Sequence, residues 1–305
     1  MRSAILAVAL VSLASSWARA QAPGTAEEAD RAYQAKDWAT AARLYGTLAK
    51  TKPESPLFKM RLGASYLGLG RVDDARAALT AASEDRSPFG AAALFHLARL
   101  ETRAGRKEEA LAALEKATGR GFAQVSLLEN EADFSGLRDD ARFKALLKAA
   151  DRNARPCAYR PEARQFDFWL GEWDVEMGGA TVGASRIEKI LNDCVVLENW
   201  TSANGYVGKS FNVYDTERKR WQQTWVDGTG RITEYYGALK DGNLYYASEQ
   251  TTTSADGTRE HVLGRMTFFN LGPDRVRQLW EQSTDEGKTW TVAFDGLYTR
   301  KKSGS

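Results

Sequence analysis

Trp, Gln, Ser and Asn side chains recur at every second position in the second half of the chain. Trp221, Gln223 and Trp225 share one face of an expected strand, and so do Gln278, Trp280 and Gln282. An apolar wall with a few neutral polar groups is typical of a small-molecule pocket. We therefore predict a site for a small, partly apolar ligand, with six lining residues: Ser210, Asn212, Trp221, Gln223, Trp225 and Gln278. The alternatives are a solid interior filled by these side chains, or a one-residue slip in register that turns them outward.

The residues that could do covalent chemistry form no catalytic constellation. The run Gly208-Lys-Ser210-Phe-Asn212 lacks the second glycine of a nucleophile elbow. A Ser-His-Asp triad would need His261, the one histidine in this half of the chain. The sequence has no phosphate-binding loop and no H-E-x-x-H zinc motif. We therefore predict no catalytic residues.

An enzyme stays open as an alternative, as an isomerase or hydrolase acting on a small molecule in the barrel. Four carboxylates could take part, although the sequence does not define their geometry: Glu198, Glu234, Glu249 and Glu281. The two functions differ in one feature of the cavity. An enzyme should place there an ionisable residue with a perturbed pKa, whereas a purely binding barrel should have only neutral polar groups.

Turn signals and alternating segments indicate an antiparallel sheet over residues 165–302. Gly-containing turns recur every eight to fourteen residues, for example Asn204-Gly205, Asp227-Gly228, Asp241-Gly242 and Asp256-Gly257. Counting the segments between them gives about ten strands, and no helix-length pattern interrupts them. Because an open meander would leave two exposed edges, we expect a closed β-barrel. Residues 283–290 also match the Asp-box pattern S-x-D-x-G-x-T-W, which we interpret as a structural hairpin.

A helical repeat precedes this region, over residues 26–150. Ala41, Ala75 and Ala110 mark equivalent positions 34 and 35 residues apart, and Gly70 and Gly105 lie at the expected turns. This pattern resembles the tetratricopeptide repeat, with about three helix pairs in an α-solenoid. The resemblance implies a groove for an unknown protein or peptide partner. The alternatives are a spacer or oligomerisation arm, and a scaffold whose barrel is solid and whose repeat groove carries the function.

A capping segment follows the repeats, and residues 151–164 are predicted to be a linker. We expect Asp133 to be the N-cap of a short turn, and Phe143, Leu146 and Leu147 to form the apolar stripe of the last helix.

The net charge and the N-terminal residues limit the classes of protein to which this chain can belong. The 305 residues carry a formal net charge of +2 and suit two domains without a nucleic-acid partner. Residues 1–20 combine Arg2, an apolar run and an Ala18-Arg19-Ala20 cleavage site, which predicts a signal peptide and a periplasmic or secreted protein. The alternative is an uncleaved anchor. We predict no other membrane span.

Export makes the two cysteines interpretable. Cys157 and Cys194 are the only pair, and an oxidising compartment favours a disulfide between them. Two separate thiols are the alternative. A metal site is not expected, since two cysteines and two histidines lie far apart in the sequence.

A family resemblance extends over nearly all of residues 160–302. Gly171-Glu-Trp173 on the first strand and Arg300 on the last resemble the calycin superfamily of lipocalins and fatty-acid-binding proteins. This resemblance implies that Arg300 covers Trp173 and closes one end of the barrel. More closely, Phe166-Asp-Phe-Trp-Leu-Gly-Glu-Trp173, Glu198-Asn-Trp200 and Trp221-Gln-Gln-Thr-Trp225 resemble a bacterial family, domain of unknown function 1579 (DUF1579), which is similar to nitrobindin-type barrels.

Nitrobindins bind heme through a histidine on a late strand. Residues 293–298 of this chain are Ala-Phe-Asp-Gly-Leu-Tyr, without a histidine. We therefore predict no heme and no other cofactor.

Overall fold

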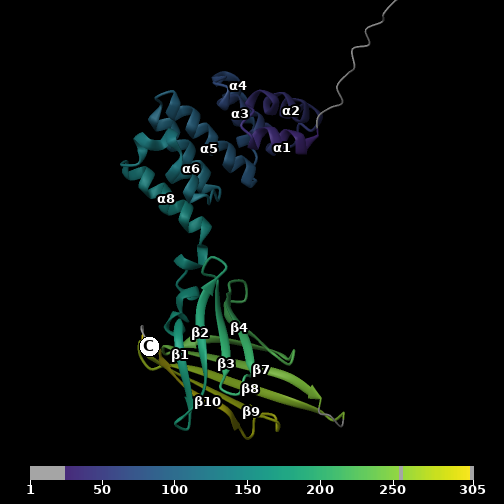
Figure 1. The fold of residues 1–305 in the computed structure, drawn as a ribbon, viewed down its shortest axis with the longest axis vertical. Helices are drawn as coiled ribbons and strands as arrows, with labels where there is room; N and C mark the ends of the chain where they lie inside the picture. Colours follow the sequence, from purple (N-terminus) through teal and green to yellow (C-terminus); the bar gives the residue numbers. More distant parts are fainter. Residues whose placement is uncertain (1–24, 254–256, 303–305) are drawn as a thin grey trace, which may run out of the picture. The chain divides into compact units, whose positions relative to one another are not determined.

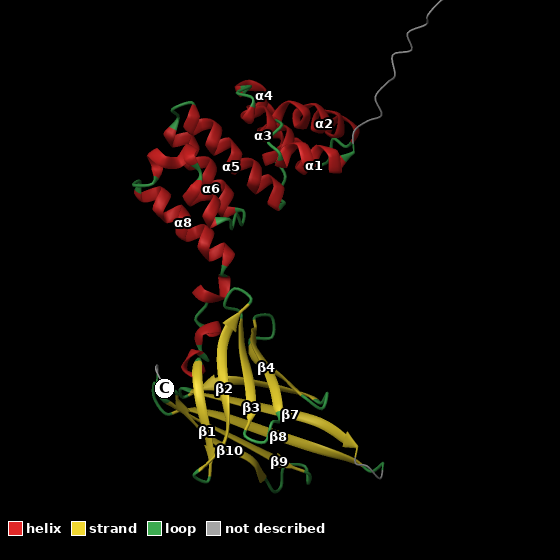
Figure 2. Ribbon diagram, viewed as in Figure 1, coloured by secondary structure: helices red, strands yellow, loops and turns green. Residues whose placement is uncertain are grey.

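The computed structural model describes residues 25–253 and 257–302, in which helices are followed by antiparallel strands (Figures 1 and 2). One compact unit comprises residues 25–122 together with 131–143. The other comprises 123–130 and the residues from 144 onward. The predicted signal peptide, residues 1–20, lies outside the described residues. Within the described ranges, no helix has both the length and the apolar character needed to cross a bilayer.

Eight α-helices and one 3-10 helix make up the described helical region. They are α1 (Ala26–Gln34), α2 (Trp38–Thr51), α3 (Pro56–Gly68), α4 (Val72–Ser83), α5 (Pro88–Arg103), α6 (Lys107–Gly119), α7 (Val125–Asn130), η1 (Ala132–Leu137) and α8 (Ala141–Ala154). The first six pack as three successive pairs, α1 with α2, α3 with α4 and α5 with α6. Two of the pairs begin with Ser-Pro, where Ser55 or Ser87 accepts a backbone N–H and the proline takes the first helical position.

The predicted repeat positions have the expected environments. Ala41, Ala75 and Ala110 are all fully buried where helices cross. Gly70 and Gly105 turn the chain inside the second and third pairs with φ of 71° and 73°. In the first pair the equivalent turn residue is Lys36 rather than glycine, and it adopts the same left-handed conformation, with φ of 58°.

One detail of the predicted cap is wrong. Glu131, not Asp133, is the N-cap of η1, and its side chain accepts the Asp133 N–H at 3.2 Å. The Asp133 carboxylate instead binds two arginine side chains of α5. A local capping rule cannot see this competition, because arginines that lie 30 and 34 residues away in the sequence attract the carboxylate.

Ten described strands close into an antiparallel barrel, which confirms the predicted fold class. They are β1 (Gly171–Met177), β2 (Ala180–Ile190), β3 (Val195–Ser202), β4 (Val207–Asp215), β5 (Arg220–Asp227), β6 (Ile232–Lys240), β7 (Asn243–Thr253), β8 (Arg259–Asn270), β9 (Arg275–Ser283) and β10 (Thr291–Arg300). Each strand pairs with its neighbours in sequence, and β1 pairs with β10, which lie side by side in Figure 1. The barrel therefore has no free edge.

The stretch before β1 closes one end of the barrel. Three short 3-10 helices precede β1: η2 (Pro156–Tyr159), η3 (Glu162–Arg164) and η4 (Asp167–Trp169). Phe166 and Trp169 are fully buried, and their rings stack with centroids 4.8 Å apart. The Arg300 guanidinium lies over the Trp173 ring, 4.2 Å from its centroid, and donates to the Leu170 carbonyl. This end of the interior is filled.

Two further contacts fix loops of the barrel unit. The Cys157 and Cys194 sulfurs lie 2.07 Å apart, at disulfide distance, and join η2 to the β2–β3 turn. In the Asp-box hairpin, Asp285 accepts the Thr289 N–H at 2.9 Å, and Gly287 has φ of 84°. Hydrogen bonds from Thr289 and Ser283 lower the pKa of Asp285 to about 2. These contacts are internal to the hairpin and stabilise its turn, which fits the structural role interpreted from the sequence.

Candidate functional site in the barrel interior

Strand register decides which side chains enter the barrel. Residues that pair directly across antiparallel strands lie on the same face of the sheet. Glu198 pairs with Ser210, Ser210 with Trp225, and Asn212 with Gln223. On the far side Gln278 pairs with Phe268, which is fully buried. All six predicted pocket residues therefore lie on the inward face.

A carboxylate lies at the centre of this inward face. Glu198 on β3 is 3% exposed. Its Oε1 accepts a hydrogen bond from Ser185 Oγ on β2 at 2.9 Å, and its Oε2 accepts one from Ser210 Oγ on β4 at 2.9 Å. Two serine hydroxyls from the strands on either side thus hold one carboxyl group.

The hydrogen bonds continue from Ser210 across β4 to β7. Asn212 Nδ2 donates to Ser210 Oγ at 3.0 Å and to the Val196 carbonyl at 3.2 Å. Tyr246 OH donates to Asn212 Oδ1 at 3.2 Å. Because both donor and acceptor atoms of the buried amide are engaged, the orientation of Asn212 is fixed.

A second chain of polar contacts lies on β8 to β10. Tyr298 OH donates to Gln278 Oε1 at 2.6 Å, and Gln278 Nε2 approaches Met266 Sδ at 2.9 Å. Burial and the neighbouring Glu198 charge raise the pKa of Tyr298 well above its usual value. The phenol is therefore a neutral hydrogen-bond donor at physiological pH.

The electrostatics of Glu198 are unusual for a buried carboxylate. No arginine, lysine or histidine within the described ranges forms an ion pair with it. Burial raises the pKa of Glu198 to about 7, and this effect outweighs the hydroxyl groups of Ser185, Ser210 and Tyr298, which favour the charged form. The group can therefore gain or lose a proton near neutral pH. A binding barrel was expected to have only neutral polar groups, so this is the feature that the alternative of an enzyme predicted.

The structure separates the six predicted residues into four sets. Ser210 and Asn212 belong to the Glu198 network, and Gln278 belongs to the chain through Tyr298. Gln223 and Trp225 face the interior beside them on β5. Trp221 lies instead at the filled end, where its Nε1 donates to Gln165 Oε1 at 3.0 Å and its ring contacts Phe166.

Sequence reasoning did not single out Glu198 as the centre of the site. Among four candidate carboxylates, Glu198 alone lies at period-2 spacing between two buried apolar residues, Val196 and Trp200. In the sequence Glu234 has the same spacing, between Ile232 and Tyr236, so alternation narrows the choice to two carboxylates and the burial of the neighbours decides between them. The contributions of Ser185, Tyr246 and Tyr298 had no such signal, because that of Ser185 depends on the register between β2 and β3, and those of the two tyrosines depend on contacts across the barrel.

Aromatic rings form the next layer beyond Glu198. Trp200, Trp225 and Phe294 lie directly against glycines of the sheet, namely Gly183, Gly208 and Gly296 respectively, where a Cβ atom would collide with each ring. Trp225, Trp280 and Phe294 are only partly buried although their strand positions face inward. The interior at this end is therefore accessible to solvent.

Other parts of the barrel are less suited to binding a ligand, a metal ion or heme. His261 lies on β8 next to inward-facing Val262, so it faces outward, where its Nε2 lies 3.0 Å from Glu249 Oε1. It cannot ligate a heme iron inside the barrel. Among the described residues there is no cluster of histidine, cysteine and acidic side chains that could hold a metal ion. A hollow of about 360 Å³ on the outer surface includes Arg277 and Asp295, which already form an ion pair at 2.7 Å.

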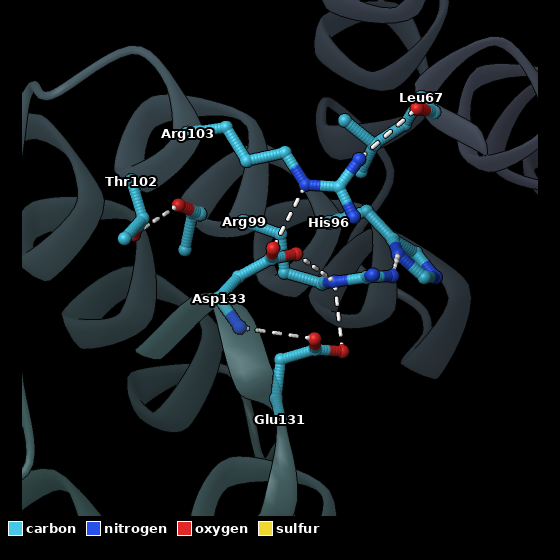
Figure 3. A network of polar contacts seen from close by, with 8 residues as sticks. Leu67, His96, Arg99, Thr102, Arg103, Glu131 and Asp133 are labelled. Atoms are coloured by element: carbon cyan, nitrogen blue, oxygen red, sulfur yellow. Dashed lines mark hydrogen bonds and ion pairs between the residues drawn. The ribbon is translucent and has the colours of Figure 1, made fainter. Parts of the chain in front are cut away.

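The helical unit (residues 25–122 and 131–143), here called the repeat unit, contains a different polar network, shown in Figure 3. Asp133 binds Arg99 Nε at 2.9 Å and Arg103 Nε at 2.8 Å, and Glu131 binds Arg99 Nε at 2.8 Å. Burial and the charges of Arg99 and Arg61 lower the pKa of His96 to about 3, so this histidine is neutral. The charges here are mutually neutralised.

Comparison with known proteins supports the helical half of this description. A tetratricopeptide repeat family model matches residues 26–82 and again residues 60–123. The two matches overlap at residues 60–82, which include most of α3 and α4, and together they cover α1 to α6. No curated protein matches the chain.

Proposed function

We propose that this chain is an exported binding protein, whose barrel holds a small, partly apolar ligand and whose repeats contact a protein or peptide. The polar layer around Glu198, next to a solvent-accessible layer of aromatic rings, carries the proposal for the barrel. Ser210, Asn212, Gln223, Trp225 and Gln278 would line the site, with Trp221 behind them at the filled end.

The energetic argument favours a ligand over a solid core. A buried carboxyl group without a counter-charge costs free energy, and apolar residues of similar volume would fill the same space at lower cost. Ser248 Oγ and Trp280 Nε1 also lie in the interior without a hydrogen-bond partner among the described residues. Polar groups left unsatisfied in this way are typical of a site that a bound molecule completes.

The remaining parts of the proposal have separate support. Repeats of this family commonly bind proteins, which supports a protein partner for α1 to α6. The Cys157–Cys194 pair fits an oxidising compartment outside the cytoplasm. The likeness to calycin and DUF1579 barrels is also part of the proposal, and the Arg300–Trp173 contact supports it.

One observation favours a second candidate function. A carboxyl group whose pKa is about 7 can act as a general acid or base at neutral pH. In this alternative, Glu198 would transfer a proton to or from a ligand held against the aromatic layer, and Tyr298 would donate a hydrogen bond to it.

The test begins with native mass spectrometry and an absorption spectrum of the full chain purified from its own host. We expect a co-purifying mass of a small molecule that is lost when Trp225 is replaced by Leu. The matched control is Trp290→Leu, because Trp290 lies in the Asp-box hairpin and bonds the Gly287 carbonyl. No co-purifying mass, together with tryptophan fluorescence unchanged by a broad panel of apolar and aromatic compounds, would contradict a ligand-binding barrel. Conversion of the bound compound, abolished by Glu198→Gln, would establish the enzyme instead.

A further inference from the structure

We propose that the ligand of the barrel is a small organic cation, whose charged nitrogen lies against the Glu198 carboxylate and the faces of Trp200 and Trp225. This inference rests on the proposed ligand-binding function and names the chemical class of the ligand.

The first step is the missing counter-charge. Two basic side chains enter the filled end of the barrel, and both are engaged elsewhere. Lys189 Nζ lies 2.6 Å from Asp167 Oδ1, and Arg300 bonds the Pro273 and Leu170 carbonyls at 2.8 Å. The groups that contact the Glu198 carboxylate are neutral hydroxyls, those of Ser185, Ser210 and Tyr298. A ligand that brings a positive charge would supply what the described residues do not.

The second step is the place of the two indole rings on the sheet. Trp200 lies on Gly183, and Trp225 lies on Gly208. A Cβ atom on either glycine would lie within 2.8 Å of Cζ2 and Cη2 of the indole, so the six-membered ring of each tryptophan lies directly on the inner wall of the barrel. The faces of aromatic rings carry the negative part of the quadrupole, which attracts cations.

The third step is the position of the rings relative to the carboxylate. Trp200 follows Glu198 by two residues on the same face of β3, and Trp225 pairs directly with Ser210, which holds Glu198 Oε2. Phe294 meets Trp200 edge-on, with centroids 6.1 Å apart. A cation placed among these groups would lie between a carboxylate and aromatic rings. A negatively charged ligand would instead meet an uncompensated carboxylate.

The solvent-accessible side of this layer supports occupation by a ligand. Trp225 and Phe294 are partly exposed although they face inward, whereas Ser210 and Asn212 beneath them are fully buried. On β7, beside Gly264 and Trp280, Ser248 is 7% exposed and its Oγ has no partner among the described residues, so it is available to a polar atom of a ligand.

The experiment uses three probes of similar size that share a benzyl group: phenethylamine, phenethyl alcohol and phenylacetate. Binding to the full chain is measured by calorimetry and by tryptophan fluorescence. We expect phenethylamine to bind at least about tenfold more tightly than phenethyl alcohol, because a charge-assisted hydrogen bond in a buried site typically contributes this much or more. Phenylacetate should bind most weakly.

Two variants test whether Glu198 causes the difference in affinity between the probes. Glu198→Gln should reduce the affinity for phenethylamine to that for phenethyl alcohol and leave the affinity for the alcohol unchanged. Glu234→Gln is the matched control, because Glu234 is an exposed carboxylate of β6, and it should change neither affinity. Phenethylamine should also bind more tightly at about pH 8 than at about pH 6, and Glu198→Gln should remove this dependence. If Glu198→Gln does not fold, the pH dependence in the unmodified chain carries the test.

The outcomes separate this inference from the function on which it rests. Equal or tighter binding of the alcohol or of phenylacetate would overturn the cation while leaving a ligand-binding barrel in place. Binding of phenethylamine that Glu198→Gln does not weaken would also overturn it. Failure of all three probes would overturn the inference, and the co-purification experiment then decides separately whether the barrel binds any ligand.

Discussion

The repeat unit and the barrel interior both contain buried or partly buried acidic side chains, but the partners differ: arginines in the repeat unit and neutral hydroxyl groups in the barrel. In the repeats, Asp133 binds Arg99 and Arg103, and Glu101 binds Arg76 and Arg106. In the barrel, neutral hydroxyl groups of Ser185 and Ser210 hold Glu198.

The difference appears in the direction of the pKa shifts. Burial would raise the pKa of Asp133, but the hydrogen bonds and charges of Arg103 and Arg99 outweigh it and lower the pKa. For Glu198 burial prevails, and the pKa rises to about 7. A neutralised network of charges stabilises a fold without further partners, whereas an unpaired carboxylate has a charge left for a ligand or a proton. This contrast is why we place the small-molecule site in the barrel.

The largest expected effect is the pH dependence of barrel stability. A raised folded-state pKa means that protonation favours the folded barrel. This stability is fully present below the ordinary value of 4.5 and is lost as the pH rises to about 7. The shift corresponds to about 3 kcal/mol. Hydrogen exchange of barrel peptides, measured between about pH 5 and pH 8, should show this loss, and Glu198→Gln should abolish it. An unchanged pH dependence in Glu198→Gln would place the carboxyl group in a solvated or paired environment.

Removal of the Asp133 charge should destabilise the repeats at neutral pH. Asp133→Asn leaves Arg103 without its carboxylate and weakens the bond to Arg99, so the repeats should lose about 1.5–3 kcal/mol of stability at neutral pH. Glu108→Gln is the matched control, since its ion pair with Arg142 is mostly exposed and should contribute less than about 1 kcal/mol. Hydrogen exchange of α5 peptides measures both variants. Equal effects of the two substitutions would show that the Asp133 network does not stabilise the repeats.

The smallest expected effect tests the serine donors of the barrel site. Ser185→Ala and Ser210→Ala each remove one hydrogen bond to the charged form of Glu198, so each should raise its pKa further, by about one unit. Ser248→Ala is the control, since this inward hydroxyl has no hydrogen-bond partner among the described residues. The midpoint of the pH-dependent stability reports the change. A midpoint that Ser185→Ala and Ser210→Ala leave in place would remove the serines from the site.

Local patterns predicted the fold because each depends on neighbouring residues. Marker alanines and turn glycines located the helix pairs, and alternation between Gly-containing turns located the strands. Alternation also placed Ser210, Asn212 and Gln223 on the inward face. Trp221 has the same pattern, yet it packs at the filled end, because its position along the barrel axis depends on the segment around Phe166.

The electrostatic character of the site could not be predicted in this way. Ser185 is 13 residues and Ser210 is 12 residues from Glu198, on the two strands that flank it, and their contacts depend on register. The lack of a cation near Glu198 among the described residues is likewise a property of the assembled barrel, because Lys189 and Arg300 face inward but reach the other end. The Asp133 capping prediction was wrong for a related reason, since two arginines brought together by the repeat stack bind the carboxylate.

The most direct test of an uncompensated carboxyl group in the barrel is a titration of Glu198 itself. The full chain would be labelled with carbon-13 at glutamate carboxyl positions, and the Glu198 resonance assigned by its absence in Glu198→Gln. We expect a pKa of about 7, lowered when phenethylamine is added, because a bound cation favours the charged form. A pKa near the ordinary value of 4.5, unaffected by phenethylamine, would contradict both the unpaired charge and the site built around it.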